Sequence, residues 1–211
     1  MPKNILYVEG VNDLFFIAGI CDSFGIPCDK RPKDVEIFIN NSGSDTQAIE
    51  AFKTAIKPGG SNIIGLVVDA DENFDARRAS LNDILTKKQY TQTDKENIFE
   101  CKSDIDMPKV GVWIMPNNSS KGRVEDFFRE IVCVNKELLD DAQKIVYEIE
   151  NKEYEQKFIP NHRQKAIIHT WLAWHNEPGG SMGLAVRKKM IDEKDELCLK
   201  FVNWLKNLYE L

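Results

Sequence analysis

The feature that most constrains this chain is a regular alternation of short strand-like runs and helical patterns over its first 132 residues. Four runs are rich in β-branched and aromatic residues, which favour strands: 4–8 (NILYV), 35–39 (VEIFI), 63–68 (IIGLVV) and 110–115 (VGVWIM). Each is followed by a segment whose apolar residues recur at helical spacing: 14–21, 44–56, 75–85 and 124–132. This order predicts an α/β fold with a doubly wound, mostly parallel sheet of four strands.

The first and third strand-like runs are apolar almost throughout, which is typical of strands covered by helices on both faces. The rest of the chain, in contrast, shows no further strand pattern. The polar stretch 90–107 is expected to be a surface excursion. From residue 135 onward the pattern favours helices over 138–149, 163–174 and 196–209, with a break at 178–180 (PGG). We therefore expect an α/β domain over 1–132 and a helical C-terminal extension over 133–211 that packs on it.

Composition excludes several classes of protein. With 42% hydrophobic residues and a net charge of −6, a chain of 211 residues is expected to fold into a packed structure. No apolar run approaches the roughly 20 residues that span a bilayer, and the start has no signal-peptide layout, so we expect a cytoplasmic protein without a membrane partner. Because 34 acidic residues outnumber 28 basic ones, any contact with nucleic acid must be local. Homo-oligomerisation stays open.

Acidic residues follow two of the predicted strands. Glu9 ends the first strand, Gly10 permits a tight turn, and Asp13 falls in the first turn of the next helix. Asp69 and Asp71 follow the third strand, where a spacing of two places them on the same side of an extended chain. The carboxyl ends of parallel strands lie along one edge, so we expect these acids to converge where such folds bind ligands.

The segment after the fourth strand, 115–126, adds further candidates at the same edge. Glu125 is a possible fifth carboxylate, and Lys121 and Arg123 are placed to meet phosphate oxygens. A structural interpretation stays open beside this one. In it, Ser119 or Ser120 caps the fourth helix and Glu125 is an ordinary first-turn acid. For the other acids, the corresponding alternative is that Asp69 and Asp71 cap the third helix while Glu9 and Asp13 are solvated loop residues.

Carboxylates gathered at one edge repel one another. At a separation of about 4 Å and an effective dielectric constant near 20, each pair costs roughly 4 kcal/mol. The site is therefore expected either to raise the pKa of some of these acids or to hold a divalent cation. Oxygen ligands without a neighbouring histidine favour Mg²⁺, Mn²⁺ or Ca²⁺ over zinc, and we expect one or two ions. His162, His169 and His175 are expected to be surface or core residues of the helical region.

The Glu-Gly dipeptide after the first strand and the Asp-x-Asp motif after the third resemble the Toprim fold. That fold is shared by topoisomerases, bacterial primases, OLD-family nucleases and small ribosomal-RNA maturases, and the resemblance covers residues 1–132. It implies that Glu9 is a general acid or base and a metal ligand, and that Asp69 and Asp71 coordinate Mg²⁺. The chain as a whole resembles small stand-alone Toprim-like proteins of prokaryotes.

Asp13 and Glu125 are similar to the additional carboxylates that hold a second metal in OLD-family nucleases. A lysine also assists in those enzymes, and Lys121 is our candidate for it. We expect neither an amino-terminal ATPase domain of the OLD type nor a domain that could deliver a topoisomerase tyrosine. We therefore expect neither strand passage nor primer synthesis.

Our leading hypothesis is a Mg²⁺-dependent phosphodiester hydrolase, similar to a nuclease, that acts on DNA or RNA. Two ions about 3.5–4 Å apart would bind to the acids, with Glu9 as the proton shuttle. Arg77, Arg78 and Arg123 would hold the flanking phosphates. The alternative is a non-catalytic Toprim-like module that binds metal and nucleic acid or a partner protein. A third hypothesis, a sugar-nucleotide-dependent glycosyltransferase, would use Asp-x-Asp but gives Glu9 no role.

Overall fold

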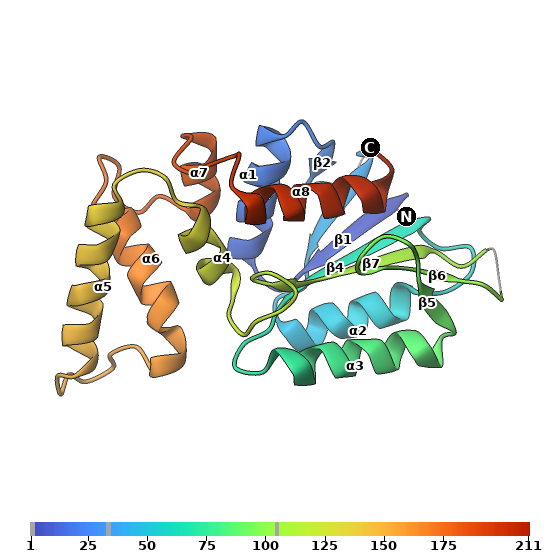
Figure 1. The fold of residues 1–211 in the computed structure, drawn as a ribbon, viewed down its shortest axis with the longest axis horizontal. Coiled ribbons are helices and arrows are strands. Elements are labelled where there is room, and N and C mark those ends of the chain that lie inside the picture. Colours follow the sequence, from blue (N-terminus) through green and yellow to red (C-terminus); the bar gives the residue numbers. More distant parts are fainter. Residues whose placement is uncertain (1–2, 33–34, 104–105) are drawn as a thin grey trace.

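The fold is built on one mixed β-sheet. A computed structural model describes residues 3–32, 35–103 and 106–211, and within them seven strands form a sheet of order β2-β3-β1-β4-β7-β6-β5 (Figure 1). The strands are β1 (Asn4–Val8), β2 (Cys28–Asp29), β3 (Ile37–Asn41), β4 (Ile63–Asp69), β5 (Tyr90–Gln92), β6 (Ile98–Cys101) and β7 (Lys109–Met115). The α/β class is confirmed. The four predicted strands, β3, β1, β4 and β7, are adjacent and parallel, but the predicted strand number of four is wrong.

The three additional strands lie at the two sides of this parallel centre. β2 is only two residues long and pairs with β3 in parallel. β6 runs antiparallel to β7, and β5 runs antiparallel to β6. Both fall in the polar stretch 90–107, of which residues 104 and 105 lie outside the described residues. An edge hairpin exposes much of its surface, so its strands carry few of the apolar residues by which strands are recognised. β3 lies two residues later than predicted.

Helices cover both faces of the sheet, as the apolar strands predicted. α1 (Val11–Ser23) and α8 (Glu196–Tyr209) lie on one face, and α2 (Asp45–Ala55) and α3 (Phe74–Lys87) lie on the other (Figure 1). Side chains of β1 alternate between the two layers: Leu6 and Val8 belong to the apolar cluster on the α1 side, whereas Ile5 and Tyr7 belong to the cluster on the α2 side. This alternation is the period-2 geometry of a strand.

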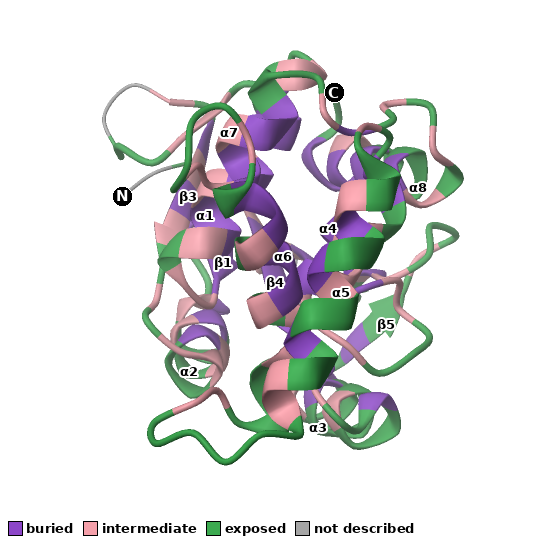
Figure 2. Ribbon diagram, turned by 90° about the vertical axis from the view of Figure 1, so that its left-hand side faces the viewer, coloured by how far each residue is buried: buried purple, intermediate pink, exposed green. Residues whose placement is uncertain are grey.

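The other helices extend the α1 side of the molecule. They are α4 (Val124–Ile131), α5 (Lys136–Glu150), α6 (Arg163–Ala173) and α7 (Met182–Arg187), with a 3₁₀ turn, η1 (Pro160–His162), before α6. α5 and α6 form a lobe beside the sheet, with the exposed outer face of α5 turned to solvent (Figure 2). The six-residue helix α7 was missed by the sequence pattern. No helix among the described residues has the length and apolarity needed to cross a bilayer.

The helices after residue 132 share one apolar cluster with the sheet. Phe128 of α4 packs edge-on against Trp171 of α6, with ring centroids 5.8 Å apart. The Tyr209 hydroxyl at the end of α8 donates a 2.9 Å hydrogen bond to the carbonyl of Ile5 in β1. These contacts hold α6 against α4 and α8 against the sheet. The expected division of the chain at residue 132 stays a prediction.

Candidate functional site

A cavity of about 330 Å³ lies at the carboxyl edge of the sheet, and four carboxylates line it. They are Glu9, Asp13, Asp69 and Glu125. Glu9 follows β1, Asp13 lies in the first turn of α1, Asp69 ends β4, and Glu125 lies in the first turn of α4. Asp13, Asp69 and Glu125 are each at least 91% buried. The structure thus brings together four of the five acids that the sequence placed at this edge.

Glu9 joins two neighbouring strands. Its Oε1 accepts a hydrogen bond of 2.6 Å from the backbone N–H of Asp69. Burial is the largest influence on this carboxyl and raises the pKa of Glu9 to about 7, with the negative charges of Asp13, Asp45 and Asp71 acting in the same direction. The hydrogen bond from Asp69 opposes the shift. Near neutral pH, Glu9 is therefore able both to accept and to donate a proton.

Asp13 and Asp69 are held by backbone N–H groups at helix starts. Asp13 Oδ2 accepts a 3.2 Å hydrogen bond from Gly10, and Asp69 Oδ1 accepts a 3.0 Å hydrogen bond from Val124. Burial, and then the charge of Glu125, raise the pKa of Asp13 to about 6. Burial and the charges of Glu9, Asp13 and Glu125 hold the pKa of Asp69 well above its usual range. The acids therefore repel one another across the cavity, which favours binding of a cation.

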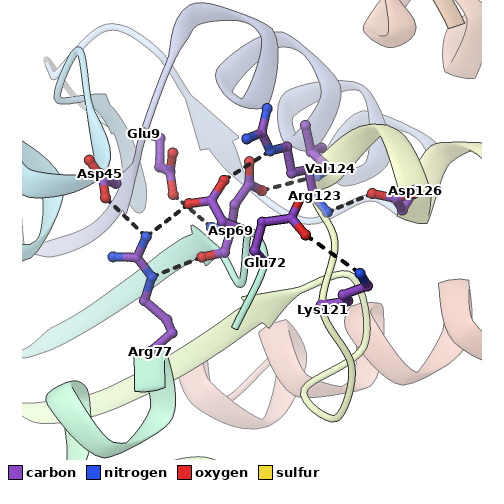
Figure 3. A network of polar contacts seen from close by, with 10 residues as sticks. Glu9, Asp45, Asp69, Glu72, Arg77, Lys121, Arg123, Val124 and Asp126 are labelled. Atoms are coloured by element: carbon purple, nitrogen blue, oxygen red, sulfur yellow. Dashed lines mark hydrogen bonds and ion pairs between the residues drawn. The ribbon is translucent and has the colours of Figure 1, made fainter. Parts of the chain in front are cut away.

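Asp71 takes a different position from its partner in the Asp-x-Asp motif. β4 ends at Asp69, and Asp71 has a left-handed backbone with φ of +51°. Its N–H and carbonyl pair with Gly122 at 3.0 and 2.9 Å. The Asp71 carboxylate is bound by Arg77 at 3.1 Å and by Arg123 at 2.8 Å. Figure 3 shows these two arginines, with Arg77 also bound to Asp45. Asp71 does not line the cavity of the other four acids.

The predicted basic residues are spread over several environments. Arg123 lines the acidic cavity. The Arg77 guanidinium is engaged by groups of the protein itself and is not free to bind phosphate. Besides Asp71, it binds Asp45 at 2.9 Å and the carbonyl of Asp69 at 3.0 Å. The exposed side chain of Lys121 lies 3.5 Å from Glu72 and does not line the cavity.

Arg78 lies on the other side of α3, away from the acidic cavity. Its guanidinium is 5.9 Å from the centroid of the Phe74 ring. It lines a separate cavity beneath α3.

The helix N-caps test the interpretation in which the acids, or Ser119 and Ser120 beside them, only cap helices. α3 is capped by Asn73, whose Oδ1 accepts from Ala76, and neither Asp69 nor Asp71 caps it. The N-cap of α4 is Arg123, not Ser119 or Ser120. Asp126 accepts a 2.8 Å hydrogen bond from the N–H of Arg123. Capping of α3 and α4 therefore does not account for the buried positions of Glu9 and Glu125. Asp13, by contrast, also accepts from the N–H of Gly10 at the N-cap of α1.

A family model described as "Protein of unknown function (DUF3226)" matches residues 3–210. The chain belongs to the DUF3226 family. Among curated proteins, none matches this DUF3226 sequence. This family description assigns no activity.

Solved structures share the fold of this DUF3226 protein. One is the hypothetical protein PH0156 from Pyrococcus horikoshii OT3, with 15% identity, a TM-score of 0.55, and coverage of 100% of this chain and 98% of that one. Another is the C-terminal region of the OLD protein of Xanthomonas campestris pv. campestris, with 12% identity, a TM-score of 0.50, and coverage of 99% and 93%. A second structure of that region has 14% identity and the same TM-score. At these identities, the similarity shows the fold alone.

Sequence reasoning missed two basic residues of the DUF3226 site. His162 of η1 and Lys165 of α6 line the acidic cavity, and Lys165 lowers the pKa of Asp13 by its charge. Both come from the helical lobe, more than 35 residues after Glu125 in the chain. No local motif marks them. Only the packing of α6 beside α4 brings them to the edge of the sheet.

The donor set fits a hard cation in its chemistry. All four side chains offer carboxylate oxygens, which Mg²⁺ and Mn²⁺ prefer. Among the residues that the structure describes, however, no group of three or more His, Cys, Asp or Glu side chains is arranged so that it could hold a metal ion. Mg²⁺ commonly binds through one or two carboxylates and keeps several waters, so the cavity fits a hydrated ion.

Proposed function

We propose that the acidic cavity binds Mg²⁺ or Mn²⁺ and that the protein hydrolyses phosphodiester bonds of a nucleic acid. One observation carries the proposal: four carboxylates, from the β1–α1 junction, the end of β4 and the first turn of α4, line a single cavity. The pKa values of Glu9 and Asp13, raised to about 7 and about 6, support it. A bound cation would offset their repulsion. When bound, such an ion polarises a phosphoryl oxygen and lowers the pKa of a coordinated water.

The acids take distinct roles in this proposal. Glu9 and Asp69 are the ligands that the Toprim resemblance implies, and Asp13 and Glu125 provide the additional carboxylates for a second ion. Asp71 completes the motif, and its pairing with Arg77 and Arg123 orients the loop that carries it. The shared fold with the C-terminal region of an OLD protein supports a nuclease-related function.

Glu9 is our candidate for the group that moves a proton. A general base works best when its pKa is near the working pH, and the pKa of Glu9 is raised to about 7. Its Oε1 is fixed by the N–H of Asp69, which leaves the other carboxylate oxygen for a water or an ion. The raised pKa is the property that distinguishes Glu9 from an ordinary surface glutamate.

The positive groups of the cavity fit a phosphate backbone. Arg123 and Lys165 line it together with His162. A forked guanidinium and a point-charge ammonium both bind phosphate oxygens. We assign phosphate contacts to Lys165 and to the Nη groups of Arg123, whose ion pair with Asp71 uses Nε. Lys121 keeps a role only if the loop that carries it moves toward the cavity, because its ammonium lies beside Glu72.

A second candidate function is a non-catalytic module that binds nucleic acid or a partner protein. The observation that favours it is the double ion pair of Asp71, whose carboxylate is bound by two arginines instead of facing the cavity. Arginine pairs of this kind neutralise a carboxylate without a metal. In such a module, the acidic cavity would have a structural role.

A cleavage assay separates the two candidates. Purified protein is titrated with Mg²⁺ or Mn²⁺ in the presence of single- and double-stranded DNA and RNA. We expect metal-dependent cleavage of at least one substrate and a loss of about 10²–10⁴-fold in Glu9→Gln. The matched control is Glu72→Gln, because Glu72 is exposed and does not line the cavity. Binding without turnover at any metal concentration would support the non-catalytic module.

A further inference from the structure

A second cavity of about 260 Å³ lies between α3 and the β7-β6-β5 side of the sheet. Its apolar lining consists mainly of Phe74, Leu81, Leu85, Phe99, Val112 and Ile114. These residues belong to the α2 and α3 side of the sheet, and none of the residues that line this cavity also lines the acidic one. Ligand sites commonly combine such an apolar floor with a few placed polar groups.

The charge of this second cavity is opposite to that of the protein. None of its lining residues is acidic, whereas the chain as a whole carries a net charge of −6. Arg78 supplies a positive charge at the rim, close to the Phe74 ring. No described residue forms an ion pair with the Arg78 guanidinium, which is thus available to an anion.

The amide of the partly buried Asn118 adds a hydrogen-bond donor to the same lining. Asn118 has a left-handed backbone with φ of +61°, and its Oδ1 accepts a 2.6 Å hydrogen bond from the N–H of Ile114. This bond fixes which end of the amide is the oxygen. Asn118 Nδ2 is buried and has no hydrogen-bond partner in the part of the chain that the structure describes. A buried donor without an acceptor is destabilising, so a shift of the Asn118 side chain that turns Nδ2 toward an acceptor atom of a ligand in the cavity would be favourable.

We propose that this cavity binds a small organic anion with an aromatic or aliphatic body. The body packs on the floor formed by Leu81, Phe99 and Val112. The acidic group, a carboxylate or sulfonate, faces Arg78, and one of its oxygens accepts a hydrogen bond from Asn118 Nδ2. This site is independent of the proposed hydrolase activity and does not require a metal.

The experiment uses 8-anilinonaphthalene-1-sulfonate as the anionic ligand and N-phenyl-1-naphthylamine as its neutral counterpart. Binding to the full chain is followed by fluorescence titration, and circular dichroism establishes that each variant is folded. We expect one site for the sulfonate, and about tenfold weaker binding in Arg78→Gln, which removes one charge-assisted contact. We expect a similar loss in Asn118→Asp, which keeps the acceptor for Ile114 but replaces the donor. The neutral compound binds wild type more weakly and is insensitive to Arg78→Gln.

Two further variants complete the test. Lys87→Gln is the matched control, since Lys87 lies on α3 but outside the cavity lining, and it should bind the sulfonate like wild type. Thr86→Trp places an indole at the cavity rim and should abolish binding. The proposal is overturned if folded wild-type protein does not bind the sulfonate. It is equally overturned if Arg78→Gln and Lys87→Gln bind the sulfonate with the same affinity, or if Thr86→Trp has no effect.

Discussion

The carboxylate of Glu9 accepts a 2.6 Å hydrogen bond from the backbone N–H of Asp69, which links the ends of the neighbouring parallel strands β1 and β4. This contact positions two acids from distant parts of the sequence on one wall of the acidic cavity. The same burial that holds them there raises the pKa of both. The acidic cavity therefore retains protons that ordinary carboxyl groups release well below neutral pH.

The stability of the metal-free protein should depend on Asp13 in a way that changes with pH. The pKa of Asp13 is raised to about 6 in the folded protein from 3.8, so the folded state binds the proton more tightly than the unfolded chain. The contribution of Asp13 to the free energy of unfolding is fully present below 3.8, its pKa in the unfolded chain. This contribution is lost as pH rises through about 6, its pKa in the folded protein. Asp13→Asn should match wild type near pH 4 and exceed it at pH 8 by roughly 2 kcal/mol.

Urea unfolding in the presence of a chelator measures this difference directly. Asparagine retains an oxygen that accepts the hydrogen bond from Gly10, so the comparison isolates the charge. A difference between wild type and Asp13→Asn that is the same at both pH values would contradict the pKa shift.

A divalent cation should stabilise the wild-type protein at pH 8. A ligand present at about 100 times its dissociation constant adds roughly 2.7 kcal/mol to the free energy of unfolding. Thermal unfolding with and without Mn²⁺ tests this for wild type and for Asp69→Asn, whose Oδ1 still accepts from Val124. We expect the increase in melting temperature to be lost in the variant. An equal increase in both proteins would place the ion elsewhere.

Lys165, not Lys121, should be the lysine that matters for cleavage. Lys165 lines the acidic cavity, whereas Lys121 is exposed beside Glu72. Loss of a positioned donor to developing negative charge costs about 100-fold in rate, so Lys165→Ala should lose activity and Lys121→Ala should retain it. An independent measurement is the pKa of Asp13 by NMR, which should rise in Lys165→Ala because Lys165 lowers it. Equal activity in the two variants would remove Lys165 from the site.

Arg77 should contribute to the free energy of unfolding. Its half-buried guanidinium binds Asp45, Asp71 and the carbonyl of Asp69. Removing one partner of a partly buried ion pair leaves carboxylates without compensation, so Arg77→Ala should lower the free energy of unfolding by about 2 kcal/mol. Arg31→Ala is the matched control, because the exposed Arg31–Asp29 pair should contribute little to stability. Urea denaturation of both variants gives the comparison, and similar values would argue against the Arg77 network.

The central fold was predictable because its strands are strongly marked. β1 and β4 are apolar along nearly their whole length, as strands buried on both faces must be. β5 and β6 form an edge hairpin with few buried side chains, and α7 is only six residues long. None of the three elements therefore has a repeat of apolar residues long enough to be recognised in the sequence. The strand number was therefore too low, while the α/β class was correct.

The residues of the site were predictable only where they lie at or just after the end of a strand. Glu9, Asp13, Asp69 and Glu125 lie at the carboxyl edge because parallel strands end there together. The expected placement of Asp71 beside Asp69 assumed an extended chain, but the chain turns left-handed at Asp71 and pairs with Gly122. Lys165 comes from the distant helix α6, and its position depends on tertiary packing that no local pattern encodes.

Diffraction from crystals soaked in Mn²⁺ at pH 8 would test the shared carboxylate site most directly, through the anomalous signal of the ion. We expect Mn²⁺ within the cavity, with carboxylate oxygens of Glu9 and Asp69 at about 2.0–2.6 Å. A cavity that stays free of Mn²⁺ at millimolar concentration, with its acids neutralised by protons or by Lys165, would contradict the proposed metal-dependent function.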